Sequence, residues 1–228
     1  MANILVNFAE GLSYQKKRKL NSLTGKYIAK FDRIIEYNIT DIDDSFTNAN
    51  AKILKHKKGL GLWIWKPYFI NKALSTINDG DFLFYCDSSS IFIRSINPMV
   101  KFMDNNDLYL LPFTLPFKES NWTSEYVMSN FKLTENQRKS NQLCASFLAL
   151  KKSSKSCQII NDWLNFCQDY NLITGNIFNI KNPELIEHRY DQSILSVVVK
   201  KQRLTMYRDP SQYGNFPQLY GKRFKTYI

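Results

Sequence analysis

A carboxylate at the end of an apolar run is the first residue in this sequence whose position suits chemistry. Asp87 follows the uncharged run FLFYC at 82–86, and Ser88, Ser89 and Ser90 come directly after it. A carboxylate surrounded by hydroxyls and loop amides can hold Mg²⁺ or Mn²⁺, which in turn can neutralise a diphosphate. An Asp that caps the turn after a strand gives the same pattern. Spacing alone leaves both interpretations open.

The block HRYDQSILSVVVKK carries the second candidate site. Ile194 and Val198 repeat at helical spacing, which predicts a helix with one buried face. Asp191 and Gln192 stand at its beginning, where an Asp can cap the helix, worth about 1 kcal/mol. His188 precedes the helix, and a carboxylate or a histidine can act as a general base.

The segment GLGLWIWKPYFINKAL at 59–74 is the third candidate, because it places two tryptophans, a lysine and a proline close together. We predict that Trp63 and Trp65 alternate on an extended stretch and that Pro67 opens a helix. Lys66 then faces outward beside the free amides of the helix N-terminus, a natural place for a phosphate. One tryptophan would be core and the other a flat wall against a base or sugar. A lysine on a solvated surface explains Lys66 equally well.

Strands and helices alternate along the chain, so we predict an α/β fold with a mostly parallel central sheet and helices on both faces. Ligands of such sheets bind beyond the carboxyl ends of the strands, which is where Asp87 stands. Trp163 shares a helix face with other apolar residues and is predicted to be core. The predicted strands are 3–9, 31–38, 82–87, 107–113 and 144–150, and the predicted helices are 13–29, 44–57, 67–77, 97–105, 154–168 and one that begins near 191.

Length and composition favour one globular domain over 1–228. With 228 residues, 44% of them apolar and 14% aromatic, the chain can bury a core of its own. No run of about 18 apolar residues is present, which argues against a membrane-spanning helix. The basic cluster QKKRK follows the first apolar run, the reverse of a secretory signal, so we expect a cytoplasmic protein. The four cysteines show no ligand-like spacing with each other or with the two histidines, which predicts free thiols and no zinc site.

The formal charge of +11 indicates an anionic partner, such as a nucleotide, a diphosphate, an acidic membrane face or a nucleic acid. A basic solvated surface explains each basic cluster taken alone. The clusters are dispersed and form no single stripe of the kind that a nucleic-acid groove needs. They are QKKRK (15–19), KHKK (55–58), KKSSK (151–155), KKQR (200–203) and GKRFK (221–225).

Three blocks taken together resemble a bacterial family of glycosyltransferases of the GT-A type. In that family a GyGyWlWKPyii segment precedes a gDiliYaDag strand, and an HR.DQSilS motif comes late. The corresponding blocks here are GLGLWIWKPYFINKAL…NDGDFLFYCDSS, CASFLALKKS and EHRYDQSILSVVVKK, in the same order. The similarity covers roughly residues 30–205. The set is specific, whereas any single block is weak.

The resemblance implies a GT-A-like fold and a nucleotide-sugar donor, UDP-linked, held at the strand ends. The sugar would pass to a hydroxyl of a glycan or lipid-linked glycan during capsule or lipopolysaccharide assembly. The donor-binding half would be about 1–110 and the acceptor and catalytic half about 111–228. On this resemblance the nucleotide and diphosphate would contact Phe8, Trp65, Lys66, Asp87, Ser88, Ser89 and Arg189, and the catalytic residues would be Asp191, Gln192 and His188.

Dependence on Mn²⁺ or Mg²⁺ is open, because the sequence departs from the family's Asp-x-Asp motif. Asp87 matches the metal- or ribose-binding acid, but DSS offers one carboxylate where the motif offers two. A literal Asp-x-Asp occurs at Asp41 and Asp43, which we interpret as the polar start of the helix at 44–57. The cation beside the leaving diphosphate would be a metal at Asp87, Lys66, Arg189 or basic residues of the C-terminal tail.

The stereochemistry of transfer is also open. Inverting transfer needs a base on the acceptor hydroxyl, for which Asp191 or His188 would serve. Retaining transfer needs a group beneath the anomeric carbon, for which Asp191 or Gln192 would serve.

Two further functions compete with an active transferase. One is a non-catalytic basic module that binds nucleic acid or the anionic membrane face, with Trp and Tyr side chains as stacking platforms. The other is a degenerate transferase that binds a donor but has lost catalysis. On the transferase interpretation we expect no nucleic-acid partner, and peripheral membrane contact through the helix at 13–29 and the tail at 221–228.

Overall fold

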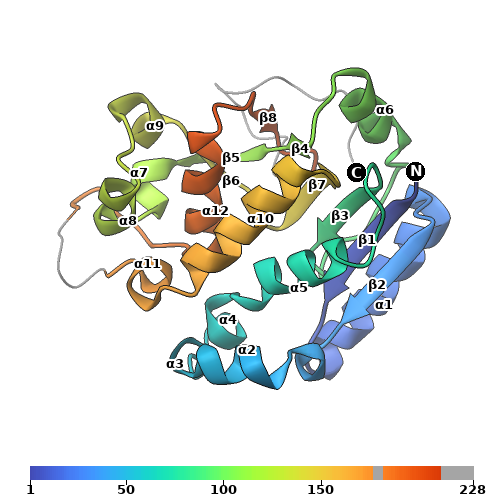
Figure 1. Cartoon of the computed structure of the whole chain (residues 1–228), viewed down its shortest axis with the longest axis horizontal. Coiled ribbons are helices and arrows are strands. Elements are labelled where there is room, and N and C mark those ends of the chain that lie inside the picture. The colour runs from blue at the N-terminus through green and yellow to red at the C-terminus, as the bar shows by residue number, and fades with distance from the viewer. Residues whose placement is uncertain (177–181, 212–228) are drawn as a thin grey trace.

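The computed structural model describes residues 1–176 and 182–211, in which helices surround two sheets (Figure 1). The strands are β1 (Asn3–Phe8), β2 (Arg33–Tyr37), β3 (Phe82–Cys86), β4 (Leu110–Leu111), β5 (Phe113–Lys118), β6 (Asn141–Leu143), β7 (Phe147–Lys151) and β8 (Tyr207–Arg208). The helices of the first half are α1 (Leu12–Thr24), α2 (Asp44–Ala49), α3 (Ala51–Leu54), α4 (Gly59–Leu62), α5 (Trp65–Leu74) and α6 (Asn97–Asn105). Those of the second half are α7 (Glu119–Trp122), α8 (Glu125–Asn130), α9 (Glu135–Lys139), α10 (Ser154–Cys167), α11 (Tyr170–Thr174) and α12 (Tyr190–Lys201).

The central sheet has the strand order β2-β1-β3-β7-β4. β1 pairs in parallel with β2 and β3, whereas β7 pairs antiparallel with β3 and β4. Within this sheet only β7 runs against the other strands, which confirms the mostly parallel arrangement. β1, β2 and β3 therefore end at one edge, and Asp87 follows β3 at that edge.

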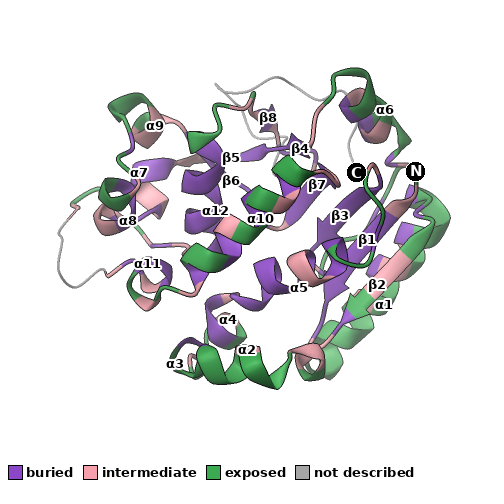
Figure 2. Cartoon of the chain, viewed as in Figure 1, coloured by how far each residue is buried: buried purple, intermediate pink, exposed green. Residues whose placement is uncertain are grey.

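Alternating side chains of the central strands form two layers of core. In β3, Leu83 and Tyr85 face one side and Phe82 and Phe84 face the other. The first side packs against α5, α10 and α12, and the second against α6 and the short π-helix Gly25–Ala29 that follows α1. The central strands are buried along most of their length (Figure 2). Trp163 of α10 is fully buried in the first layer, which confirms its predicted place in the core.

A second sheet, with the order β6-β5-β8, was not predicted. The predicted strand at 107–113 is instead two strands separated by Pro112, which has no amide hydrogen for a sheet ladder. β4 joins the central sheet and β5 joins the small one. Pro112 therefore lies where the chain passes from one sheet to the other.

The single helix predicted at 44–57 was wrong, because the chain bends at Asn50 between α2 and α3. The buried Asn50 amide donates to Phe46 O over 3.0 Å and to Gln168 Oε1 over 3.2 Å. Asp43 stands at the N-cap position of α2, as expected for the Asp41/Asp43 pair, and its carboxylate accepts from the Tyr68 hydroxyl over 2.6 Å.

Three other expectations concern the whole chain. Among residues 1–176 and 182–211, no helix combines the length and the apolarity needed to cross a bilayer. All four cysteines are free thiols, as predicted. The basic tail at 221–228 lies outside the described residues.

Candidate active site

α4 and the residue after it, Trp63, form a left-handed turn before α5, so the predicted extended stretch was wrong. The five residues from Gly59 to Trp63 have φ values of 61°, 52°, 92°, 56° and 61°. Each L-residue in this conformation costs roughly 1–2 kcal/mol, and the two glycines relieve only part of that strain. α5 begins at Trp65, which makes Pro67 its third residue rather than its first.

Lys66 is buried in the first turn of α5, so the prediction that it faces outward was also wrong. Its side chain is only 5% exposed, and Nζ lies 3.3 Å from Asp87 Oδ1 and 3.7 Å from Asp191 Oδ2. A lysine is buried to this depth only with charged partners, because moving a lone ammonium out of water is costly. The end of β3 and the start of α12 therefore meet on one lysine.

The protonation of this cluster follows from burial and from the three charges together. Burial lowers the pKa of Lys66, but Asp87 and Asp191 raise it by more, so the pKa lies above its ordinary value. Burial raises the pKa of Asp191 to about 7, against the lowering effect of Lys66, and Asp87 adds to the rise. Lys66 thus keeps its proton, whereas Asp191 exchanges one near neutral pH. A carboxyl of this kind suits general acid and base chemistry.

Backbone and side-chain hydrogen bonds hold Asp87 at the end of β3. Its N–H donates to Ser146 O over 2.8 Å, and the Tyr85 hydroxyl donates to Asp87 Oδ1 over 2.7 Å. Our sequence analysis missed Tyr85. It lies two positions before Asp87, and the period of two along a strand was the signal that places both on one face.

Asp191 is the second residue of α12, and Arg189 rather than Asp191 takes the N-cap position. The Asp191 carbonyl accepts from Trp163 Nε1 over 2.8 Å, which ties α12 to α10. Among the described residues, the buried Asp191 Oδ2 has no hydrogen-bond partner. Apart from the ion pair with Lys66, this oxygen remains for a ligand.

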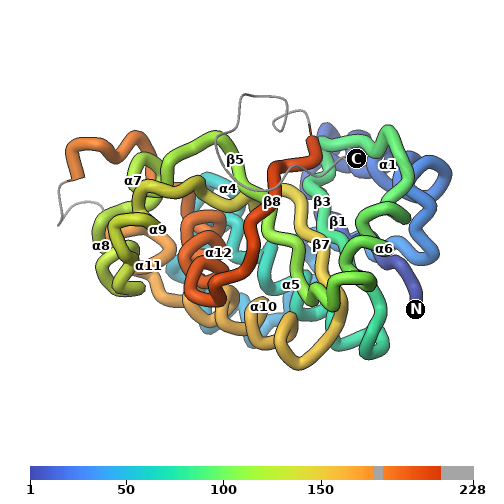
Figure 3. The backbone as a smooth tube through the Cα atoms, turned by 90° about the horizontal axis from the view of Figure 1, so that it is seen from above, coloured from blue at the N-terminus to red at the C-terminus, as the bar shows by residue number. Residues whose placement is uncertain are grey.

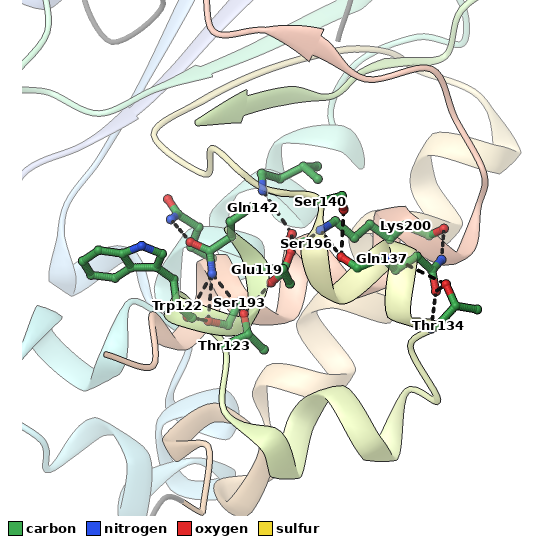
Figure 4. Close-up of polar contacts among 12 residues, drawn as sticks. Glu119, Trp122, Thr123, Thr134, Gln137, Ser140, Gln142, Ser193, Ser196 and Lys200 are labelled. Atoms are coloured by element: carbon green, nitrogen blue, oxygen red, sulfur yellow. Dashed lines mark hydrogen bonds and ion pairs between the residues drawn. The ribbon is translucent and has the colours of Figure 1, made fainter. Parts of the chain in front are cut away.

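Gln192 is fixed by buried hydrogen bonds. Its Oε1 accepts from Ala145 N–H over 3.2 Å, and its Nε2 donates to Gln142 Oε1 over 2.8 Å. Gln142 is fully buried, and its own Nε2 donates to Trp122 O over 3.0 Å and to Ser193 Oγ over 3.3 Å (Figure 4). The Gln192 amide therefore has one orientation, in which one N–H remains for a ligand.

A buried ion pair between Lys200 and Glu119 lies next to this hydrogen-bond network. Lys200 Nζ lies 2.5 Å from Glu119 Oε2, which also accepts from Ser196 Oγ over 2.5 Å (Figure 4). Thr123 Oγ1 donates to the other oxygen of Glu119 over 2.5 Å. Because Glu119 belongs to α7, these contacts anchor α7 to α12, the helix that carries Asp191.

Two cavities meet at Asp87 and Trp63. The Asp191 cavity has a volume of about 310 Å³ and the Trp65 cavity a volume of about 670 Å³. The Asp191 cavity is lined by Lys58, Trp63, Lys66, Asp87, Ser146, Glu187, Arg189, Tyr190, Asp191 and Gln192. The Trp65 cavity is lined by Phe8, Ala9, Glu10, Gly11, Tyr14, Lys57, Gly59, Leu60, Trp63, Trp65, Tyr85, Asp87, Ser88 and Ser89.

Aromatic side chains form the wall between the sheet edge and the Trp65 cavity. Trp65 is buried, stacks on Phe8 with 3.9 Å between the ring centroids, and donates from Nε1 to Gly59 O over 2.8 Å. Trp63 is half-buried and lines both cavities. Trp65 is thus the tryptophan that packs in the core, although it also lines the Trp65 cavity, and the role of Trp63 as a wall against a base or sugar stays a prediction.

Among the predicted site residues, His188 alone lines neither cavity. Its ring packs under Gly175, where an added Cβ would lie 2.6 Å from the imidazole, and Nδ1 accepts from Ser124 N–H over 3.3 Å. Burial lowers the pKa of His188 to about 4, so the ring is neutral at pH 7. Its place in the fold is structural, and we assign it no role as a base.

Cations gather at the rim of the Asp191 cavity. The Arg189 guanidinium carbon lies 4.2 Å from the Trp122 ring centroid, a stacking contact that fixes its side chain. Lys58 forms an ion pair with Glu187, and Tyr190 lies beside them. The sequence analysis missed these last three as site residues, although Lys58 belongs to the KHKK cluster and Tyr190 stands inside the HRYDQS block.

The carboxylates of the site do not fit a divalent cation. Among the described residues, no group of three or more His, Cys, Asp and Glu side chains is placed to hold a metal ion. The ranges 177–181 and 212–228 contain none of these four residue types. Between Asp87 and Asp191 lies the Lys66 ammonium, which occupies the place that a bridging cation would take.

Comparisons with known proteins identify the fold. No protein-family model matches the sequence, and no curated protein is similar to it in sequence. Mouse xyloside xylosyltransferase 1, in its apo form, matches over 89% of this chain and 82% of that chain, with a TM-score of 0.50 and 8% identity. The galactosyltransferase LgtC, in complex with donor and acceptor sugar analogs, matches over 86% of this chain and 70% of that chain, with a TM-score of 0.48 and 14% identity. An active-site mutant of LgtC matches over 86% of this chain and 69% of that chain, with a TM-score of 0.45 and 13% identity. The chain has the α/β fold of GT-A glycosyltransferases.

Proposed function

We propose that the chain is a glycosyltransferase that moves a sugar from a nucleotide-sugar, UDP-linked, to a hydroxyl of a glycan or lipid-linked glycan acceptor. One observation carries the proposal: Lys66, Asp87 and Asp191 converge where two cavities meet beyond the carboxyl ends of β1 and β3. This edge is where open α/β sheets bind nucleotides. The resemblance of the sequence blocks to bacterial surface-glycan transferases supports the choice of donor and acceptor.

The larger Trp65 cavity suits the nucleotide. Phe8, Trp63 and Trp65 supply aromatic surface, and Ser88 and Ser89 supply hydroxyls at the end of β3. The smaller Asp191 cavity suits the transferred sugar and the acceptor hydroxyl. The diphosphate would then lie at the junction, close to Asp87 and within reach of the cations Lys66, Lys58 and Arg189.

Transfer breaks the bond from the anomeric carbon to the diphosphate oxygen and forms one to the acceptor oxygen. Negative charge grows on the diphosphate as the bond breaks, and preorganised cations lower that barrier. Lys66 supplies a fixed positive charge without a metal. Asp191 Oδ2 accepts the acceptor proton if the anomeric configuration inverts, or faces the anomeric carbon if it is retained. The configuration of the product distinguishes these two routes.

Ligand-induced thermal stabilisation tests the proposal. The purified chain is melted with UDP, GDP, CMP and their sugars, with and without Mn²⁺, alongside Asp87→Ala and the matched control Asp104→Ala. Asp104 also forms an ion pair, with Lys151, but lines neither cavity. We expect stabilisation by uridine nucleotides without added metal, reduced in Asp87→Ala and retained in the control.

Other outcomes have distinct meanings. A shift that requires Mn²⁺ would place a metal at Asp87 and contradict the role given to Lys66. Donor binding without turnover on any acceptor would indicate a degenerate transferase. If no nucleotide shifts the melting temperature and the chain binds nucleic acid in a salt-sensitive way, the basic binding module replaces the transferase.

A further inference from the structure

Helix α1 presents apolar side chains to solvent. Leu12, Leu20 and Leu23 are 80%, 51% and 45% exposed, and Tyr27, just after the helix, is 62% exposed. Figure 2 shows α1 as a largely exposed helix. Figures 1 and 3 place it at the end of the molecule opposite α8 and α9. Such a concentration of exposed leucines on one element indicates a surface that contacts something else.

None of these leucines packs against the sheet, because the inner face of α1 is held to the sheet by polar contacts. Asn21 is its only buried residue. Asn7 Nδ2 donates to Asn21 Oδ1 over 2.8 Å, and Asn21 Nδ2 donates to Ser90 O over 2.9 Å. The apolar residues of the outer face are therefore not needed for packing of the core.

Basic residues share the outer face with the leucines. Leu12, Lys16, Lys19, Leu20 and Leu23 fall at i, i+4, i+7, i+8 and i+11, which is one stripe of a helix. The range 11–31 contains no Asp or Glu, and Lys17, Lys26 and Lys30 add further exposed positive charge. We call the outer surface of residues 12–28 the α1 face.

An open groove of about 680 Å³ continues the α1 face toward β2. Arg18, Lys19 and Lys26 line it together with Leu23, Tyr27 and Ile34, and with the polar residues Gln15, Ser22 and Glu36. The Glu36 carboxylate is already paired with Arg18, at 3.7 Å between Oε2 and Nε. Cations beside apolar side chains match the chemistry of an acidic headgroup above the ends of its acyl chains.

We propose that the α1 face is a docking surface for an anionic lipid bilayer. A second copy of the chain fits poorly, because a two-fold contact would oppose the lysines of one copy to those of the other. Nucleic acid also fits poorly, because leucines find no partner on phosphates and do not stack on bases. The docking stands without the proposed sugar transfer. If both hold, the bilayer surface lies beside the substrate cavity, since Gly11 and Tyr14 at the start of α1 line the Trp65 cavity.

Flotation of the full chain with vesicles tests the proposal. The vesicles are phosphatidylcholine alone or phosphatidylcholine with phosphatidylglycerol. Two double variants carry the test, Leu20→Ser with Leu23→Ser and Lys16→Glu with Lys19→Glu. Controls change exposed residues elsewhere in the chain, Ile186→Ser with Phe166→Ser and Lys101→Glu with Lys139→Glu.

We expect binding to the anionic vesicles, and a loss of roughly tenfold or more in both α1 variants. The two controls should bind like the wild type, and added salt should weaken binding. All substituted side chains are exposed, so melting temperatures should be unchanged. The proposal is overturned if the wild type does not bind, if the controls lose as much as the α1 variants, or if the α1 variants instead lose dimerisation or nucleic-acid binding.

Discussion

Lys66 and Asp191 form a buried ion pair, with 3.7 Å between Nζ and Oδ2 and with both side chains only 5% exposed. They come from opposite halves of the chain. Asp87, at 3.3 Å from the same Nζ, completes the cluster and is partly open to solvent. The lysine therefore acts both as a tie between the two halves and as a charge beside the candidate substrate site.

Removal of this lysine should destabilise the fold. Lys66→Met leaves two carboxylates without their shared cation, and breaking a buried pair typically costs about 3–5 kcal/mol. Urea unfolding measures the loss. The control is Lys72→Met on the same helix, whose ion pair with Asp43 is solvent-exposed and should contribute far less to stability. Equal losses in the two variants would show that Lys66 is not an essential partner.

Stability should depend on pH through Asp191. Its pKa is about 7 in the folded state and 3.8 in its ordinary state, so the folded chain keeps a proton that the unfolded chain has lost. The contribution of this group is full below about pH 4 and is lost as pH rises through about 7. From below about pH 4 to above about pH 7, the free energy of unfolding of the wild type should therefore fall by on the order of 4 kcal/mol relative to that of Asp191→Asn. A pH-independent difference would contradict the assigned pKa.

Activity should also follow the ionisation of Asp191. On the proposed function the carboxylate form is the active one, so kcat/KM should rise with pH through about 7. Lys66 lowers the pKa of Asp191, so Lys66→Met should move the acidic limb of any residual activity to higher pH. If the acidic limb of the pH profile does not move in Lys66→Met, then Lys66 does not control the ionisation of Asp191.

Gln142 should act as a positioning residue for Gln192. Gln142→Leu removes the acceptor of Gln192 Nε2 and the donor to Trp122 O, at a cost of about 1–3 kcal/mol in stability. Because the Gln192 amide can then rotate, kcat should fall more than KM rises. Gln158→Leu, at an exposed position on α10, is the control. A variant with lower stability but unchanged kcat would assign Gln142 a structural role only.

The left-handed turn should require glycine at Gly59. An added Cβ would lie 2.3 Å from the Trp63 ring, so Gly59→Ala should displace Trp63 and weaken ligand binding in both cavities. Gly80→Ala is a matched control, since Gly80 also has a positive φ, its Cβ would come no nearer than 3.8 Å to another residue, and it lines neither cavity. Both variants should lose stability from backbone strain, whereas only Gly59→Ala should lose nucleotide-induced stabilisation. Equal ligand responses in the two variants would argue against a role for Trp63.

Much of the fold could be predicted because periodicity is a local property of the chain. β1, β3, α6 and α10 form close to their predicted ranges, since apolar spacing and flanking turn residues mark each of them. The second sheet and the bend at Asn50 could not be predicted in this way. They depend on partners distant in sequence, such as Gln168 for Asn50.

The sequence by itself determined which chemical groups stand at the strand end and at the start of the late helix. Asp87 was proposed from residue type and position, whereas Asp191 and Gln192 were proposed from the resemblance of the HRYDQS block to a known family. Only the tertiary structure decided that Lys66 is buried between the two carboxylates, that His188 lies away from both cavities, and that α1 turns its leucines outward. Burial and charge pairing depend on which segments meet in space, and no local pattern in the chain specifies those meetings.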